Sequence, residues 1–278
     1  MSSQGKASLN AKTTEAKKRA LPARDVQEFR ANLAKVLSEK DSQGRSWASS
    51  RWGVYAFYDY DGEPIYVGQT NEQLRVRIQR HLTNQRTDAV AMRILDTFEV
   101  AEVEVWPLWD LEEVRKASSP KEVYRQALDE LNQCEYTAYC NAIETSRFKA
   151  ILNEKIPPVS ELRETMPPSI RRSVVSDHMR DERGHPDIRI ARRAETLARL
   201  AAVARERGEV SAGLRRVVVV QAVRLAYLSA ARLADVEGLE APDPTTMDVT
   251  RLVGQVKSEH ALPDGPGEDA DDAMALFD

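Results

Sequence analysis

The chain has 278 residues, of which 42% are hydrophobic and 30% are charged, and its net charge is -4. This length allows one large domain or two ordinary ones, at roughly 100 to 200 residues per domain. No stretch approaches the roughly 20 apolar residues that cross a bilayer, so we expect no membrane partner. The spacing of the two cysteines, Cys134 and Cys140, suits neither a zinc cluster nor a disulfide framework and predicts a cytoplasmic location.

The distribution of charge is more informative than its sum. Residues 1–46 hold ten Lys or Arg against five acids, and residues 171–216 hold twelve against seven. The last twenty residues hold seven acids and no Lys or Arg. Basic segments of this kind are typical of nucleic-acid-binding surfaces, although solvated helix faces have the same composition. An acidic tail can also occupy a basic groove until nucleic acid displaces it.

The first part of the chain is predicted to be a basic helical N-terminal arm, residues 1–46, with a helix over residues 25–37. Alternating apolar and polar residues over 54–58 predict a strand, and the Asp-Gly pair at 61–62 predicts a hairpin. The returning strand covers residues 64–68. A helix is then predicted from near Glu72, capped by Thr70 or Asn71.

A third strand is predicted over residues 98–108, from apolar residues at strand spacing. A long helix follows over 121–151, with a break near 145–146. This order predicts an α+β (α/β) domain, residues 47–158, with a small, mainly antiparallel three-stranded sheet flanked by helices.

The proline pairs at 157–158 and 167–168 bound a linker, residues 159–170. A helical region is predicted over 171–258, with helices at 191–203, 214–236 and 246–257. Its role is open: it could bind DNA, form a dimer interface or dock a protein partner. Residues 259–278 have the composition of an acidic disordered tail.

The central stretch resembles the GIY-YIG nuclease superfamily. Residues 53–55 (GVY) are similar to its first tripeptide and residues 66–68 (YVG) to its second, each with Val where the name has Ile. Arg77 and His81 stand one turn apart on the next predicted helix. That spacing resembles the branch of compact type II restriction enzymes. The resemblance covers residues 52–158. It implies the small α+β fold predicted above and the chemistry described next.

The resemblance also implies a metal-binding glutamate on the helix after the third strand, and an asparagine shortly after that helix. Asn153 resembles the asparagine. Glu135 is the favoured glutamate, because a carboxylate among apolar neighbours needs a partner such as a metal. Glu144 remains an alternative, since the spacing from Glu135 to Asn153 is longer than is usual for the family and that from Glu144 is shorter.

The implied activity is metal-dependent hydrolysis of DNA phosphodiester bonds. The implied cofactor is Mg²⁺, with Mn²⁺ as a substitute, and a hard cation of this kind is often held by only one or two carboxylates. The site residues carried over are Tyr55, Tyr66, Arg77, His81, Glu135 and Asn153.

The roles of these residues follow from their chemistry. Arg77 offers an always-charged fork that fits phosphate geometry. Tyr55 is the expected general base, with His81 to take up the proton or orient the water. Tyr66 would hold a phosphate or the attacking water, and Asn153 would fix the geometry of the site.

The expected substrate is double-stranded DNA, and the expected setting is restriction or another defence role. A homodimer is expected because two-fold pairing presents one site to each strand. The candidate DNA-binding arginines are Arg75, Arg80, Arg171, Arg172, Arg192 and Arg193. Two alternatives stay open: a non-catalytic DNA-binding or scaffold protein that retains the fold, and a repair or mobile-element nuclease.

Overall fold

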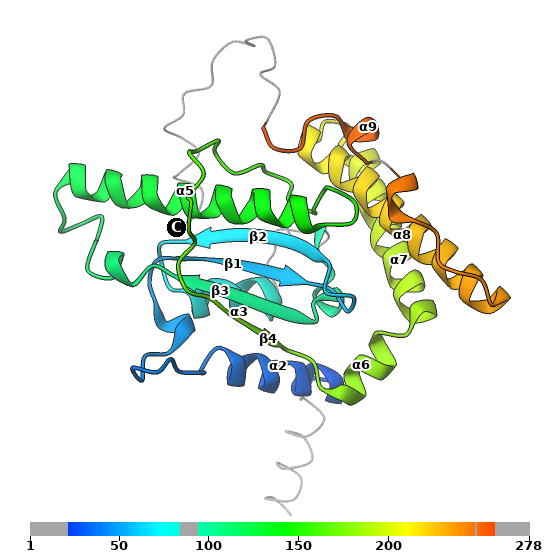
Figure 1. Cartoon of the computed structure of the whole chain (residues 1–278), viewed down its shortest axis with the longest axis horizontal. Coiled ribbons are helices and arrows are strands. Elements are labelled where there is room, and N and C mark those ends of the chain that lie inside the picture. The colour runs from blue at the N-terminus through cyan, green and yellow to red at the C-terminus, as the bar shows by residue number, and fades with distance from the viewer. Residues whose placement is uncertain (1–21, 84–93, 248, 259–278) are drawn as a thin grey trace, which may run out of the picture.

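Figure 1 shows the computed structural model, which describes residues 22–83, 94–247 and 249–258. The predicted arm over 1–21 and the predicted tail over 259–278 lie outside these ranges. In them the chain forms one four-stranded antiparallel sheet in the order β2-β1-β3-β4. The strands are β1 (Gly53–Tyr58), β2 (Pro64–Thr70), β3 (Glu102–Pro107) and β4 (Ile170–Ser173).

The prediction of three strands was therefore wrong by one. β4 pairs with β3 and begins inside the segment predicted as linker and helical region. Of its four residues only Ile170 is buried, so the strand has no apolar alternation that could reveal it. β3 also begins later than predicted, because Thr97–Glu99 form a 3₁₀ turn in which the Asp96 side chain accepts the Phe98 N–H.

The α-helices of the described ranges agree in part with those predicted from the sequence. They are α2 (Arg24–Val36), α3 (Leu74–Leu82), α5 (Lys121–Thr145), α6 (Asp177–Arg183), α7 (Pro186–Arg207), α8 (Ala212–Glu237) and α9 (Val249–Val253). The predicted break is present at Ser146, which is extended. The helix predicted over 246–257 is reduced to α9, after a 3₁₀ turn at Pro244–Thr246.

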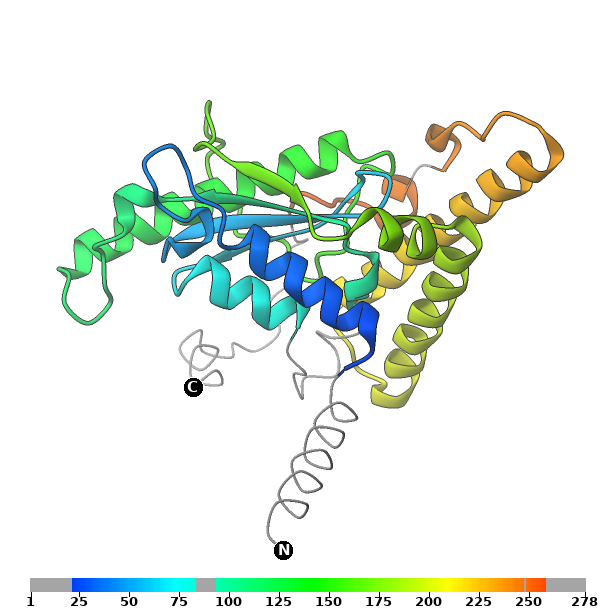
Figure 2. The same ribbon diagram turned by 90° about the horizontal axis from the view of Figure 1, so that it is seen from below.

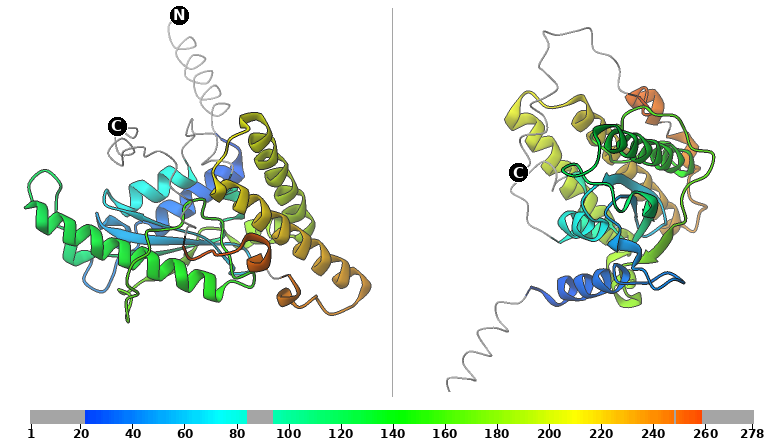
Figure 3. Two further views of the ribbon diagram at one scale, coloured as in Figure 1. Left: turned by 90° about the horizontal axis from the view of Figure 1, so that it is seen from above. Right: turned by 90° about the vertical axis from the view of Figure 1, so that its left-hand side faces the viewer.

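The sheet lies between two helical layers. α2 and α3 lie side by side on one face, and α5 packs on the other face, along β2 and β1 (Figures 1, 2 and 3). α7 and α8 form an antiparallel pair at the end of the sheet where β1 turns into β2 (Figure 1). The buried apolar residues, from Phe29 to Val256, form one continuous core that includes both the sheet and the C-terminal helices.

α8 is the one helix in the described ranges that is long and apolar enough to cross a membrane. A core helix passes the same test, and Leu214, Val217 and Val220 of α8 are buried in the protein. The helix also carries Arg224, which is 1% exposed and paired with an acid. Its composition is therefore explained in part by packing within the protein and is weak evidence for a membrane span.

The turn between β1 and β2 is fixed by Asp59, which is only 2% exposed. Its Oδ1 accepts the backbone N–H groups of Asp61 and Glu63, at 2.9 and 3.1 Å. Its Oδ2 accepts from three arginines: Arg189 at 3.2 Å, Arg193 at 2.9 Å and Arg224 at 2.8 Å. One carboxylate thus joins the hairpin to both C-terminal helices.

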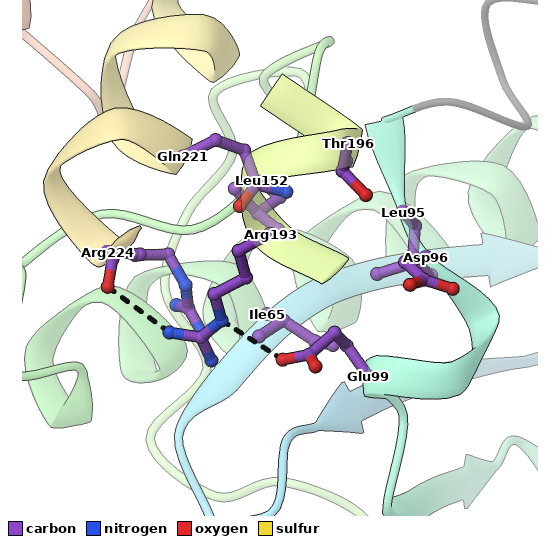
Figure 4. A pocket seen from close by; sticks show the side chains of 9 residues that line it. All are labelled: Ile65, Leu95, Asp96, Glu99, Leu152, Arg193, Thr196, Gln221 and Arg224. Carbon is purple, nitrogen blue, oxygen red and sulfur yellow. Dashed lines mark hydrogen bonds and ion pairs between the residues drawn. The ribbon is translucent and has the colours of Figure 1, made fainter. Parts of the chain in front are cut away.

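Glu99 completes this arrangement, since it accepts from Arg193 Nε at 3.0 Å. Figure 4 shows Arg193 between the Glu99 carboxylate and the backbone carbonyl of Arg224. We call Asp59, Glu99, Arg189, Arg193 and Arg224 the Asp59 cluster. Burial alone would raise the pKa of Asp59, but Arg224, Arg193 and Arg189 hold it below its ordinary value.

Asp59→Ala is expected to lower the free energy of unfolding by about 3 to 5 kcal/mol, because it leaves three buried guanidinium groups without their common partner. For a chain of this size that corresponds to a fall in Tm of roughly 10 °C, measurable by calorimetry. Glu195→Ala is the matched control, because it removes an exposed ion pair with Arg199 on α7 and is expected to cost about 1 kcal/mol or less. Equal losses in the two variants would contradict this account of the cluster.

Candidate active site

The two motif glycines stand where other chain segments come too close for a side chain. A Cβ at Gly68 would lie 2.6 Å from the Tyr55 hydroxyl oxygen and 3.0 Å from a ring carbon of Tyr66. A Cβ at Gly53 would lie 2.7 Å from both a Leu74 methyl carbon and the Trp106 carbonyl oxygen. The glycines therefore let the tyrosine rings lie flat on the sheet and let α3 approach β1.

An aromatic group lies between the sheet and α3. Tyr55 is directly opposite Gly68 in the strand register, and Phe57 is opposite Tyr66. The His81 ring lies against all three aromatic residues, with centroids 5.8 Å from Tyr55, 6.3 Å from Phe57 and 5.4 Å from Tyr66. The helix face that carries His81 is thus packed directly onto the two motif tyrosines.

Arg77 lies one turn before His81 and is partly buried. The Tyr55 hydroxyl and Arg77 Nε are both buried, and neither makes a hydrogen bond of good geometry within the described residues. The Arg77 guanidinium and the Tyr66 hydroxyl nevertheless lie near enough to the Tyr55 hydroxyl to interact with it. Burial raises the pKa of Tyr55 well above its ordinary value; Tyr66 adds to this and Arg77 opposes it. In the protein alone Tyr55 therefore keeps its proton at neutral pH.

Glu135 brings a carboxylate from α5 close enough for its charge to act on Arg77 and on the two tyrosines. It is 8% exposed, and burial raises its pKa to about 7, although the nearby Arg77 charge opposes the shift. Its charge in turn raises the pKa values of Tyr55 and Tyr66. Glu144, by contrast, is exposed near the end of α5 and forms an ion pair with Lys257. The structure brings Glu135 to the tyrosines and leaves Glu144 at the surface.

Asn153 lies beside the free edge of β2. Its side-chain oxygen accepts the Val67 N–H at 3.0 Å, and its side-chain nitrogen donates to the Val67 carbonyl at 2.8 Å. The Leu152 N–H also donates to the Ile65 carbonyl, at 2.8 Å. Asn153 therefore pairs with the strand as a backbone would and holds β2 at the residue between Tyr66 and Gly68.

The six candidate DNA-binding arginines all have partners within the protein. They pair as follows: Arg75 with the Leu37 carbonyl at 2.8 Å, Arg80 with Glu72 at 2.7 Å, Arg171 with Glu102 at 2.6 Å, Arg172 with Glu39 at 2.6 Å, Arg192 with Asp96 at 2.7 Å, and Arg193 with Asp59 and Glu99. Arg193 is 5% exposed and belongs to the Asp59 cluster. The other five are partly or fully exposed.

One comparison with known proteins bears on this geometry. Residues 51–113 match the GIY-YIG catalytic domain. The match supports the GIY-YIG superfamily, whose domain is that of endonucleases, and it suggests a nuclease. No curated protein and no solved structure matches the chain.

The GIY-YIG match covers β1, β2, α3 and β3, so it contains Tyr55, Tyr66, Arg77 and His81. Glu135 and Asn153 lie beyond it, and their place at the site rests on the packing of α5 and of the segment beside β2. GIY-YIG nucleases use divalent metal ions.

A single buried carboxylate, that of Glu135, is what the candidate site offers such an ion. No group of three or more His, Cys, Asp or Glu side chains that could hold a metal occurs in the described ranges. A buried carboxylate with its pKa raised to about 7 is, however, a group that a cation would stabilise. Mg²⁺ commonly takes one or two carboxylates and completes its shell with water.

Sequence reasoning missed two neighbours of this candidate site. Phe57 contacts His81 and stacks on Tyr66, at 5.8 Å between ring centroids. Gln69 donates to Asn132, which lies one turn before Glu135 on α5, at 3.0 Å. The alternation along β1 identifies Phe57 as sharing a face with Tyr55, whereas no local signal pairs Gln69 with α5.

The raised pKa of Glu135 predicts a pH-dependent stability. A carboxyl whose pKa is about 7 in the folded protein and 4.5 ordinarily favours folding at acidic pH, and this contribution is lost as the pH rises through about 7. At pH 8 without divalent cations, the free energy of unfolding of Glu135→Gln should therefore exceed that of wild type by about 1 to 3 kcal/mol. The variant should accordingly unfold at a higher temperature. At pH 4.5 the two proteins should be nearly equal.

Thermal unfolding at pH 4.5 and pH 8 measures this difference, with Glu144→Gln as the control on the same helix. Glu144 is exposed, so its variant should show no such gain at pH 8. Mg²⁺ should raise the Tm of wild type and Glu144→Gln but not of Glu135→Gln. If Glu135→Gln showed the same pH dependence of stability as wild type, burial would not raise the pKa of the Glu135 carboxyl.

Proposed function

We propose that the chain is a metal-dependent endonuclease that hydrolyses phosphodiester bonds of double-stranded DNA. The observation that carries the proposal is the convergence of α5 on the matched domain. The matched residues supply two tyrosines, an arginine and a histidine, and α5 adds the buried carboxylate of Glu135 to them. A carboxylate close to an arginine is suited to holding a cation and a phosphate together.

The proposed cofactor is Mg²⁺, with Mn²⁺ as a substitute, held by Glu135. When bound there, the ion would polarise a phosphoryl oxygen and stabilise the leaving oxygen. Arg77 has a buried Nε without a hydrogen-bond partner in the described residues, and we assign that donor to a phosphate oxygen. The same charge opposes the rise in the Tyr55 pKa and so favours the tyrosinate.

The proton chemistry is assigned to Tyr55 and His81. The buried Tyr55 hydroxyl, which interacts with Arg77 and Tyr66, is the proposed general base towards the attacking water. Because burial disfavours its ionised form, its proton needs an acceptor as it leaves. His81 is the proposed acceptor, since its ring lies against Tyr55 and Tyr66 and histidine ordinarily titrates near neutral pH.

Tyr66 and Asn153 are proposed to position the reacting groups. The Tyr66 hydroxyl would hold the phosphate or the attacking water. Asn153 holds β2 through both hydrogen bonds to Val67 and so sets where Tyr66 and Gly68 lie. It acts through the strand and touches neither substrate nor metal.

The biological setting is proposed as restriction or another defence role in the cytoplasm, on the strength of the Arg77-x-x-x-His81 spacing. Cutting both strands with one small site favours a homodimer. The exposed candidates among the sequence-predicted arginines, Arg171 and Arg172, could exchange their acid partners for phosphates. Arg193 is left out of the proposed DNA contacts because it is buried.

Cleavage of mixed-sequence duplex DNA in Mg²⁺, Mn²⁺ or EDTA tests the function. Wild type should give discrete fragments with either ion and none in EDTA. Glu135→Gln and Arg77→Ala should each lower the rate by about 100-fold or more, as loss of an electrostatic stabiliser does.

Glu144→Gln is the matched control, and it should cut at nearly the wild-type rate. Loss of cutting in that variant with survival in Glu135→Gln would move the metal ligand to Glu144. Binding of DNA without cutting under any metal condition would instead favour a non-catalytic DNA-binding or scaffold role.

A further inference from the structure

The turn between α7 and α8 carries a group of arginines that no part of the proposed mechanism uses. They are Arg205, Arg207, Arg215 and Arg216, and we call them the turn arginines. The first three are exposed and Arg216 is partly exposed. None of the four forms an ion pair with an acid anywhere in residues 22–83, 94–247 and 249–258, which separates them from Arg171, Arg172 and Arg192.

Two of the turn arginines donate hydrogen bonds to backbone carbonyls instead. Arg215 donates to the Gly208 carbonyl at 3.3 Å, and Arg216 donates to the Glu154 carbonyl at 2.8 Å. Glu206 and Glu209 lie in the same stretch but pair with none of the four among the described residues. The stretch 205–216 therefore holds four arginines against two acids and keeps its positive charge unneutralised.

The start of α8 is docked beside the candidate active site. Gly213 packs so closely on Glu154 that any Cβ there would overlap the Glu154 carbonyl oxygen. The Ser211 hydroxyl, which caps α8, donates to the Glu154 carboxylate at 2.7 Å. Glu154 follows Asn153 directly in the chain, and Asn153 holds β2 at Val67.

The electrostatics agree with this placement. Burial raises the pKa of Tyr66 to about 12, and the charge of Glu154 is among the groups that add to the rise. Glu154 is thus close enough to Tyr66 for its charge to be felt there. The turn also projects from the face of the sheet that carries α3, and hence on the side of Tyr55, Tyr66 and His81 (Figures 2 and 3).

We propose that the turn arginines are a phosphate-binding surface that holds the backbone of the DNA next to the bond being cut. This inference rests on the proposed nuclease function and names the part of the chain that positions its substrate. Unpaired guanidinium groups beside the site can bind phosphates without first breaking an ion pair. The gain in affinity comes from release of counterions from the DNA and is therefore sensitive to salt.

The test compares Arg207→Ala/Arg215→Ala with Lys116→Ala/Lys121→Ala, which also removes two exposed charges without ion-pair partners in the described part of the chain. The lysines flank the start of α5, at the opposite end of the molecule from α7 and α8 (Figure 1). Binding of a short duplex is measured by fluorescence anisotropy in EDTA, where no cutting occurs, over a range of salt concentrations.

The arginine variant should bind about tenfold more weakly at about 0.1 M salt, with a slope of log K against log salt smaller by about 2. In Mg²⁺ it should raise KM for cleavage and leave kcat near the wild-type value. Arg207→Lys/Arg215→Lys should recover most of the affinity, and the lysine-to-alanine control should match wild type. Unchanged melting of each variant confirms that the fold is intact.

Two results would overturn the inference in distinguishable ways. If wild type binds and cuts DNA while the arginine variant equals the lysine-to-alanine control in affinity and salt slope, the turn arginines do not contact DNA and the nuclease assignment stands. If wild type neither binds nor cuts duplex DNA, the surface has lost its proposed partner and the proposed function fails with it.

Discussion

The structure depends on one carboxylate that accepts three buried arginines. Asp59 directly follows the first motif strand, and its partners Arg189, Arg193 and Arg224 come from the two long C-terminal helices. A charge buried to this degree is tolerated only when it is paired and hydrogen-bonded, so neither the hairpin nor the helices can adopt these positions without the other. The C-terminal helices are for this reason part of the architecture that holds the site, and their long apolar faces are explained in part by that packing.

The hairpin that begins at Asp59 joins the two strands that bear the motif tyrosines, and these tyrosines lie where chain segments approach each other closely. Gly68 leaves room for the Tyr55 ring, Gly53 leaves room for α3, and Asn153 replaces the missing neighbour at the free edge of β2. Each of these contacts restricts the position of β1 or β2 in addition to the hydrogen bonds within the sheet. Rigid placement suits chemistry in which a phosphate, a water and a proton acceptor must be aligned. Burial also makes the charged form of Glu135 unfavourable in the protein alone, so a cation would stabilise it.

The sequence was informative wherever structure is set by near neighbours. Alternation and an Asp-Gly turn predicted the hairpin, and helical spacing placed Arg77 and His81 on one face. β4 escaped prediction because a strand with a single buried residue has no period to detect. Arg193 was interpreted as a DNA contact because composition alone cannot reveal that Asp59 and Glu99, each more than ninety residues earlier in the chain, pair with it. The same limit left Glu135 and Glu144 both open, because composition does not tell that Glu135 is buried and Glu144 is exposed in the folded protein.

The central claim is that the buried Glu135 carboxylate binds a metal ion beside the motif tyrosines. Anomalous diffraction from crystals containing Mn²⁺ is the most direct measurement of it. The account predicts one strong manganese peak at bonding distance from the Glu135 carboxylate, on the side that faces Tyr55 and Arg77, and no such peak in Glu135→Gln crystals. A manganese peak at the Glu144 carboxylate instead, or an unchanged peak in Glu135→Gln crystals, would contradict the claim.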